Sequence, residues 1–113
     1  MSDRRPAVSL WLPPLLMMAL IFGLSSIPSL GTGLGTWDLL LRKLAHLTEY
    51  AVLAFLVRRA VSELPTFLFA LGYAVTDELH QSFVRGREGR PRDVAIDAVG
   101  IVAGLVAARR LLR

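Results

Sequence analysis

The chain carries no charged residue between Arg5 and Asp38, and this stretch limits its possible folds more than any other feature. Residues 7–28 are apolar over a length sufficient for a helix that crosses the hydrocarbon core of a bilayer. The small-residue motif at which signal peptides are cleaved does not follow this segment. We therefore expect an uncleaved first membrane helix.

Three further apolar segments follow, at residues 43–57, from residue 65 to about residue 84, and at residues 93–108. The mean hydropathy of +0.54 exceeds that of an ordinary soluble protein. The thirteen Lys and Arg residues lie mostly at the ends of the apolar segments, which is typical of membrane helices rather than of a nucleic-acid-binding surface. We predict an all-α fold: one domain over residues 1–113, an integral membrane bundle of four transmembrane helices in the cell membrane, with no nucleic-acid partner.

Several kinds of chemistry are excluded by what the sequence lacks. It has no Cys, which excludes disulfides, thiolate metal sites and cysteine nucleophiles. It also lacks the G-x-S-x-G, H-E-x-x-H and P-loop motifs. Any catalysis would depend on a small set of polar residues inside the helices. These candidate catalytic residues are His46, Glu49, Asp77, Glu78 and His80.

Polar residues inside three of the apolar segments have matching depths. If the chain zigzags across the membrane, the start of the second segment, the end of the third and the start of the fourth lie at one face. His46, Asp77 and Asp97 then each lie about one or two helical turns inside that face. Because buried ionisable groups are unfavourable in a bilayer, a cluster of them is a candidate functional site.

The link between the third and fourth segments carries four arginines within eight residues. A guanidinium group matches a phosphate with two parallel hydrogen bonds. We expect this link to form the rim of a shallow polar pocket for an anionic ligand, such as a phospholipid or a polyprenyl-linked cell-wall intermediate. Arg109 and Arg110 lie at the opposite face and need only anchor the fourth helix.

The orientation in the membrane follows from the charges that flank the first helix. Arg4 and Arg5 precede it, and no cation follows it until Arg42. Positive charge favours the cytoplasmic side, so we expect the N-terminus in the cytoplasm. Four crossings return the C-terminus to the cytoplasm and leave the polar cluster and the arginine-rich link at the outer face.

Five motifs in order resemble the VanZ-like family of small bacterial membrane proteins: LSSIP (24–28), KLAHLTEY (43–50), DELHQ (77–81), GREGRPRD (86–93) and DVAIDAVG (93–100). The resemblance implies a four-helix envelope protein related to one linked to teicoplanin resistance. It implies no particular reaction. One position departs from the family pattern, because Arg90 stands where a small residue, often Ser, is usual.

The resemblance also implies which residues serve a site. The matching positions are Lys43, His46, Glu49, Tyr50, Asp77, Glu78, Gln81, Arg87, Asp93, Asp97 and Gly100. All of these except Gly100 are our candidate ligand-binding residues. Gly100 and Gly104 form a G-x-x-x-G spacing, which favours close helix packing and makes self-association possible.

Alternatives stay open for the polar residues. Asp77, Glu78 and His80 are as well explained by interhelical salt bridges to Lys43 and Arg87 as by ligand or acid–base roles. A lone histidine among apolar residues usually hydrogen-bonds a neighbour, so we expect neither a bound metal nor a cofactor.

We favour an envelope protein that binds an anionic lipid-linked or peptidoglycan-related molecule. The first alternative is a metal- or acid/base-dependent hydrolase or transferase that acts on a lipid-linked phosphate. The second is a proton-coupled transporter subunit that uses the buried acids and histidines as a relay.

Overall fold

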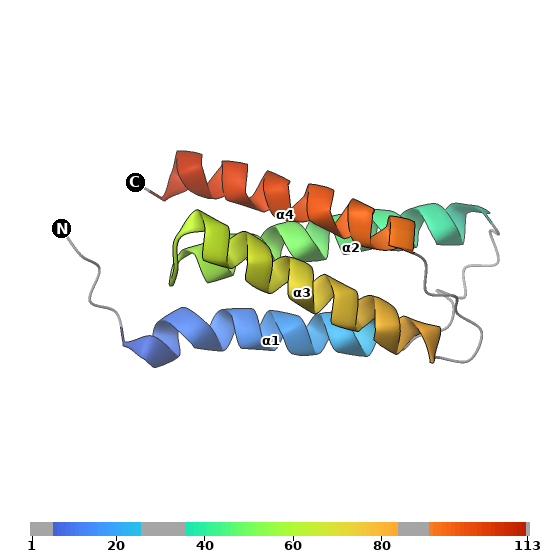
Figure 1. Ribbon diagram of the computed structural model, residues 1–113, viewed down its shortest axis with the longest axis horizontal. Helices are drawn as coiled ribbons and strands as arrows, with labels where there is room; N and C mark the ends of the chain where they lie inside the picture. Colours follow the sequence, from blue (N-terminus) through green and yellow to red (C-terminus); the bar gives the residue numbers. More distant parts are fainter. Residues whose placement is uncertain (1–5, 26–35, 84–90, 113) are drawn as a thin grey trace.

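The computed structural model describes residues 6–25, 36–83 and 91–112, and this part of the chain forms four helices and no strands (Figure 1). The helices are α1 (Ala7–Ser25), α2 (Thr36–Arg58), α3 (Glu63–Ser82) and α4 (Pro91–Leu111). The prediction of an all-α fold with four helices is therefore confirmed.

Three helices begin earlier than the apolar pattern predicted. α2 begins at Thr36 rather than at residue 43. α3 begins at Glu63, and Pro65 lies in its first turn. Proline is tolerated there because N–H groups of the first turn have no hydrogen-bond partner within the helix. α4 begins at Pro91, because proline suits the first helical position. The apolar segments underestimate these helices because the helices continue into their polar ends.

The four helices run alternately up and down, so the start of α1 and the end of α4 lie at the same end of the bundle (Figure 1). We call this end, which holds Arg58 and Glu63, the terminal end. The opposite end, where α3 finishes and α4 begins, is called the distal end. Arg109 donates two hydrogen bonds to the Glu63 carboxylate at the terminal end, of 2.5 and 2.7 Å. Arg109 thus has a defined partner and is more than an anchor for α4.

The closest approach between helix backbones is that of α4 to α2. A Cβ atom on Gly100 would lie 3.2 Å from the carbonyl carbon of Leu47, and one on Gly104 would lie 2.9 Å from that of Ala51. Both glycines are buried by this contact. The G-x-x-x-G spacing therefore serves packing within the chain, and self-association through these two glycines is not possible without separating α2 from α4.

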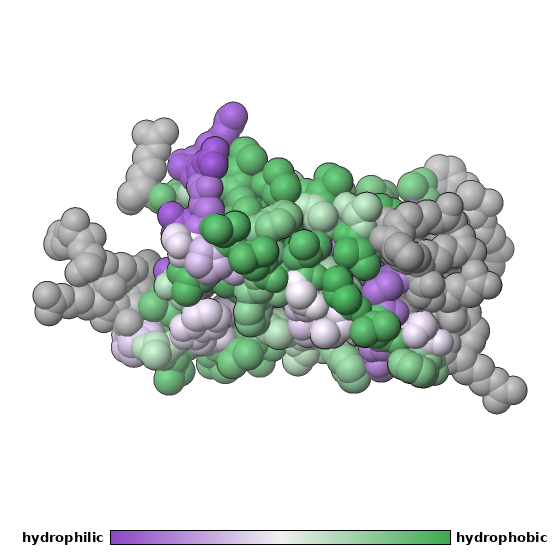
Figure 2. All heavy atoms as spheres, in the orientation of Figure 1, coloured by the Kyte–Doolittle hydropathy of each residue, from purple (hydrophilic) through white to green (hydrophobic). Residues whose placement is uncertain are grey.

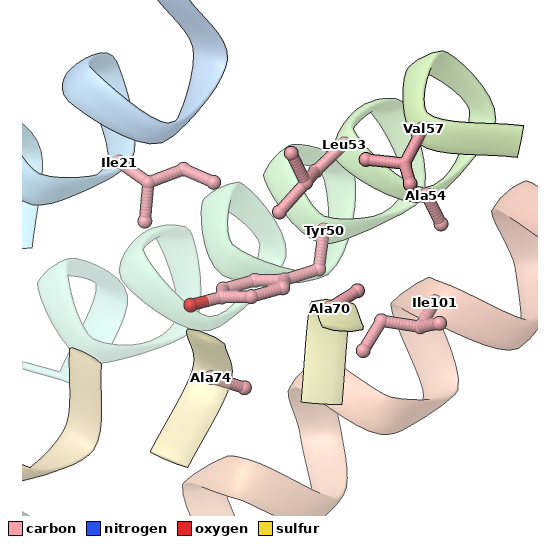
Figure 3. Close-up of a cluster of buried hydrophobic side chains, with 8 residues drawn as sticks. All are labelled: Ile21, Tyr50, Leu53, Ala54, Val57, Ala70, Ala74 and Ile101. Atoms are coloured by element: carbon pink, nitrogen blue, oxygen red, sulfur yellow. The ribbon is translucent and has the colours of Figure 1, made fainter. Parts of the chain in front are cut away.

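The apolar core is small and is centred on α2 (Figure 3). Its buried members are Ile21, Tyr50, Leu53, Ala54, Val57, Ala70, Ala74 and Ile101. Many larger apolar side chains point outward instead, and Figure 2 shows them over much of the surface between the two ends.

Length and composition make one of the described helices, α1, a candidate to cross a membrane by itself, over Ala7–Leu24. Helix length and composition therefore support one of the four predicted membrane spans, that of α1.

Candidate functional site

Among the described residues, one histidine and four carboxylates are buried in the distal half of the bundle, and none of them exposes more than 8% of its surface. They come from α2, α3 and α4. We call this set the polar cluster; its members are His46, Glu49, Asp77, Glu78 and Asp97. Three helices therefore bring ionisable groups to one depth, as the spacing in the sequence predicted.

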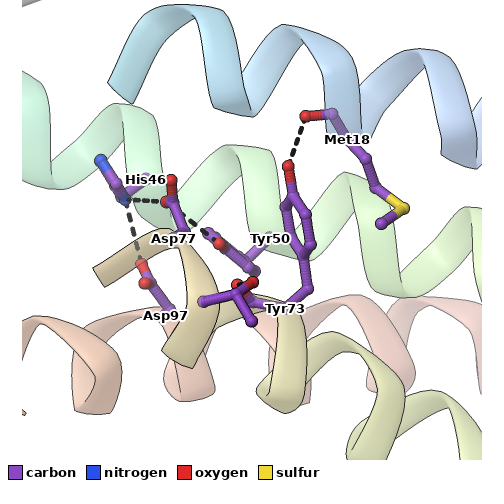
Figure 4. A network of polar contacts seen from close by, with 7 residues as sticks. Met18, His46, Tyr50, Tyr73, Asp77 and Asp97 are labelled. Carbon is purple, nitrogen blue, oxygen red and sulfur yellow. Dashed lines mark hydrogen bonds and ion pairs between the residues drawn. The ribbon is translucent and has the colours of Figure 1, made fainter. Parts of the chain in front are cut away.

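His46 lies between two carboxylates from different helices (Figure 4). Its Nδ1 atom is 3.3 Å from Oδ1 of Asp97 and 4.0 Å from Oδ2 of Asp77. The small residue Gly100 lies one turn after Asp97 and packs on the backbone of Leu47, next to His46. This close packing is what allows the short aspartate side chain to reach the imidazole.

Tyr50 lies one turn after His46 on α2, and its hydroxyl donates a hydrogen bond of 3.2 Å to Oδ2 of Asp77. The Tyr50 side chain is fully buried. Its ring is nearly parallel to that of His46, with the centroids 6.3 Å apart. We predicted Tyr50 as a ligand-binding residue, but in this structure its hydroxyl is directed at Asp77. Its role here is to hold that carboxylate in place.

Contacts with α1 involve Tyr73 and His80 of α3. The Tyr73 hydroxyl donates a hydrogen bond of 2.6 Å to the main-chain oxygen of Met18. The His80 ring stacks on Phe22, with the centroids 4.2 Å apart. His80, predicted as a candidate catalytic residue, thus contributes to the packing of α3 on α1. Tyr73 was missed, although it lies one helical turn before Asp77 and shares its face of α3.

The cations Arg42 and Lys43 precede His46 by about one turn on α2, and both are half-buried. One terminal nitrogen of the Arg42 guanidinium is buried, and so is one carboxylate oxygen each of Glu49 and Glu78. The sequence pattern indicated Arg42 only as a flanking charge. The structure shows that part of this residue enters the interior. Of the other predicted residues, Arg87 and the side chains of Gln81 and Asp93 lie outside the part that the structure describes.

A family model described as VanZ/LLP1 matches residues 7–113. The chain belongs to the VanZ-like family. The match includes all four helices and every residue of the polar cluster. No curated protein and no solved structure matches the chain significantly.

The polar cluster of this VanZ-like protein has two chemical capacities. An imidazole in contact with two carboxylates can hold and transfer a proton. One ligand atom each from His46, Asp77 and Asp97 also lie within 4.8 Å of one another, so the three can hold a metal ion. Imidazole nitrogen and carboxylate oxygen are donor atoms that zinc accepts in proteins.

Proposed function

We propose that this VanZ-like protein is a multi-pass membrane protein of the bacterial cell envelope that binds an anionic lipid-linked or cell-wall-related ligand at the outer face. A role in glycopeptide resistance, teicoplanin resistance in particular, is the biological context that we propose for this binding.

The observation that carries the proposal is the inverted distribution of polar and apolar side chains. On α3, Leu64, Leu68 and Leu79 expose 66%, 57% and 58% of their surfaces, whereas Asp77 and Glu78 of the same helix are buried. A helix of a water-soluble bundle has the opposite arrangement, with its apolar stripe inward. Lipid is the solvent that suits an apolar exterior around a polar interior.

This distribution also explains why α2, α3 and α4 have a lower hydropathy than a typical membrane span. The charges that reduce their mean hydropathy are either in the buried polar cluster or at the helix ends, as with Arg58, Arg109 and Arg110. A mean hydropathy over a window of consecutive residues treats all these charges as if they faced lipid. The outward-facing residues of the same helices are largely apolar, and that composition supports four spans.

The arginines in the sequence at the distal end support an anionic ligand. The polar cluster lies in the distal half of the bundle, and the sequence from the end of α3 to the start of α4 contains Arg85, Arg87 and Arg90, with Arg92 as the second residue of α4. Guanidinium groups at headgroup depth bind phosphate oxygens. The flanking charge of α1 favours a cytoplasmic N-terminus, and four crossings then direct this end outward.

Mass spectrometry of the purified protein tests the proposal. We expect a phosphate-bearing lipid or polyprenyl-linked molecule to copurify with the wild-type protein. Arg87→Lys should reduce its amount with the membrane level unchanged, because lysine cannot reproduce the bidentate contact. Arg110→Lys, at the terminal end, is the matched control and should retain the ligand. Equal retention in both variants, or no bound anionic molecule in the wild type, would refute the proposed binding role.

The alternative is a hydrolase or transferase that acts on a lipid-linked phosphate. The contact of His46 with both Asp77 and Asp97 favours it, because this group can serve as an acid–base pair or hold a metal. Conversion of the copurified molecule during incubation, lost in Asp97→Asn, would support the enzyme over the binding protein.

A further inference from the structure

We propose that His46, Asp77 and Asp97 form a binding site for one divalent transition-metal ion, with Zn²⁺ as the best fit. The site goes beyond the proposed ligand-binding role. It reverses our expectation from the sequence, in which the likeliest use of a lone histidine was a hydrogen bond to a neighbour.

The three ligand atoms lie within 4.8 Å of one another, which is near the spacing of a tetrahedral zinc site. In such a site, with bonds of about 2.1 Å, neighbouring ligand atoms lie about 3.4 Å apart. The separation of His46 Nδ1 from Asp97 Oδ1 is 3.3 Å, and that from Asp77 Oδ2 is 4.0 Å. The terminal torsion angle of an aspartate side chain varies over a broad range at little energetic cost. A small rotation of Asp77 therefore brings its Oδ2 atom nearer to the spacing of a zinc site. Three protein ligands leave the fourth position open, as in catalytic zinc sites.

A charged histidine that simply bridges the two aspartates explains the geometry less completely. Both distances are measured from the same Nδ1 atom, which carries at most one proton and can donate it well to one carboxylate at a time. A divalent ion, by contrast, can contact all three ligand atoms at once.

The surroundings of the three residues have the features of a supported metal site. The Tyr50 hydroxyl donates to Oδ2 of Asp77 and fixes its orientation, which is how hydrogen bonds to ligating carboxylates act in metalloproteins. His46 and Asp97 come from α2 and α4, and the packing of Gly100 on Leu47 fixes the position of these two helices relative to each other. The aspartates are buried, so the site does not depend on mobile surface acids.

Metal binding by the purified full-length protein tests this inference without any knowledge of the lipid ligand. The protein in detergent, with affinity tags removed, is stripped with a chelator, and Zn²⁺ or Mn²⁺ is then titrated by calorimetry. We expect saturable binding of Zn²⁺ that is stoichiometric with the chain. Co²⁺ in place of zinc should give the intense visible absorption of a tetrahedral site with nitrogen and oxygen ligands.

Variants distinguish this site from adventitious binding. His46→Ala and the nearly isosteric Asp97→Asn should lose stoichiometric binding, whereas Glu63→Gln, an acid-to-amide change at the terminal end, should bind like the wild type. Size-exclusion chromatography establishes which variants are folded, and Asp97→Asn decides the matter if His46→Ala aggregates. Absence of saturable binding by the folded wild type overturns the proposal by itself, as does unchanged binding by folded Asp97→Asn. Neither result bears on the lipid-binding proposal, which is tested separately by mass spectrometry.

Discussion

Tyr50 and Tyr73 are two phenols on neighbouring helices whose hydroxyls have different partners. Tyr50 donates to Asp77 of the polar cluster, and Tyr73 donates to the main-chain oxygen of Met18. Tyr50→Phe should weaken Zn²⁺ binding about tenfold or more, because removing a hydrogen bond to a ligating carboxylate has that effect in metalloproteins. Tyr73→Phe removes a phenol of the same size and should leave the affinity unchanged. Calorimetric titration of both variants checks this, and an equal loss in the two would contradict a specific role for Tyr50.

Both substitutions should also destabilise the bundle. Each leaves a carboxylate or carbonyl oxygen with one donor fewer, at a cost of about 1–3 kcal/mol if the oxygen is buried. Thermal unfolding in detergent, followed by circular dichroism, should show a lower midpoint for Tyr50→Phe than for the wild type. An unchanged midpoint would mean that the hydrogen bond to Asp77 is replaced by another donor.

The pairing of α2 with α4 depends on small residues rather than on large apolar side chains. Gly104→Ala would bring a Cβ within 2.9 Å of the carbonyl carbon of Ala51, so the two helices must separate. We expect a loss of about 1–3 kcal/mol in stability. Gly72→Ala is the matched control, since nothing lies within 4 Å of a Cβ at that position. It should be neutral or stabilising by up to about 1 kcal/mol, because alanine has the higher helix propensity. Equal unfolding midpoints would show that α2 and α4 tolerate separation.

The helical periodicity of the sequence determines how much of the architecture could be predicted. The number of residues from the end of each helix, together with an alternating up-and-down path, gives the depth of each residue in the bundle. These depths were sufficient to predict that His46, Asp77 and Asp97 lie close together. Rotation about each helix axis is set by packing. The G-x-x-x-G spacing predicted a close helix contact but not its partner on α2, and the stacking of His80 on Phe22 has no signal in one sequence. α2, α3 and α4 begin before their apolar segments, because each helix includes polar residues that precede its apolar run.

For the whole molecule, the account depends on a bundle that is apolar outside and holds the polar cluster in the distal half of its interior. The structure shows both properties within the described residues, and the VanZ-like family match covers residues 7–113. Four crossings of a membrane follow as a proposal, with the terminal end in the cytoplasm. Tags fused to either terminus should therefore be inaccessible to protease in intact cells and accessible after permeabilisation. A C-terminal tag that is cleaved from outside would contradict an even number of crossings with a cytoplasmic N-terminus.

The central claim is that α2, α3 and α4 cross the membrane and present the polar cluster toward the outer face. The chain has no Cys, so single-cysteine variants can be labelled without background. Ser62 is exposed at the terminal end between α2 and α3, and Ser82 is exposed at the distal end of α3. With a membrane-impermeant thiol reagent on intact cells, or spheroplasts where an outer membrane excludes the reagent, Ser82→Cys should be labelled. Ser62→Cys should be labelled only after the membrane is opened. Labelling of both positions from the same side would contradict a membrane-spanning α3 and with it the proposed outward-facing site.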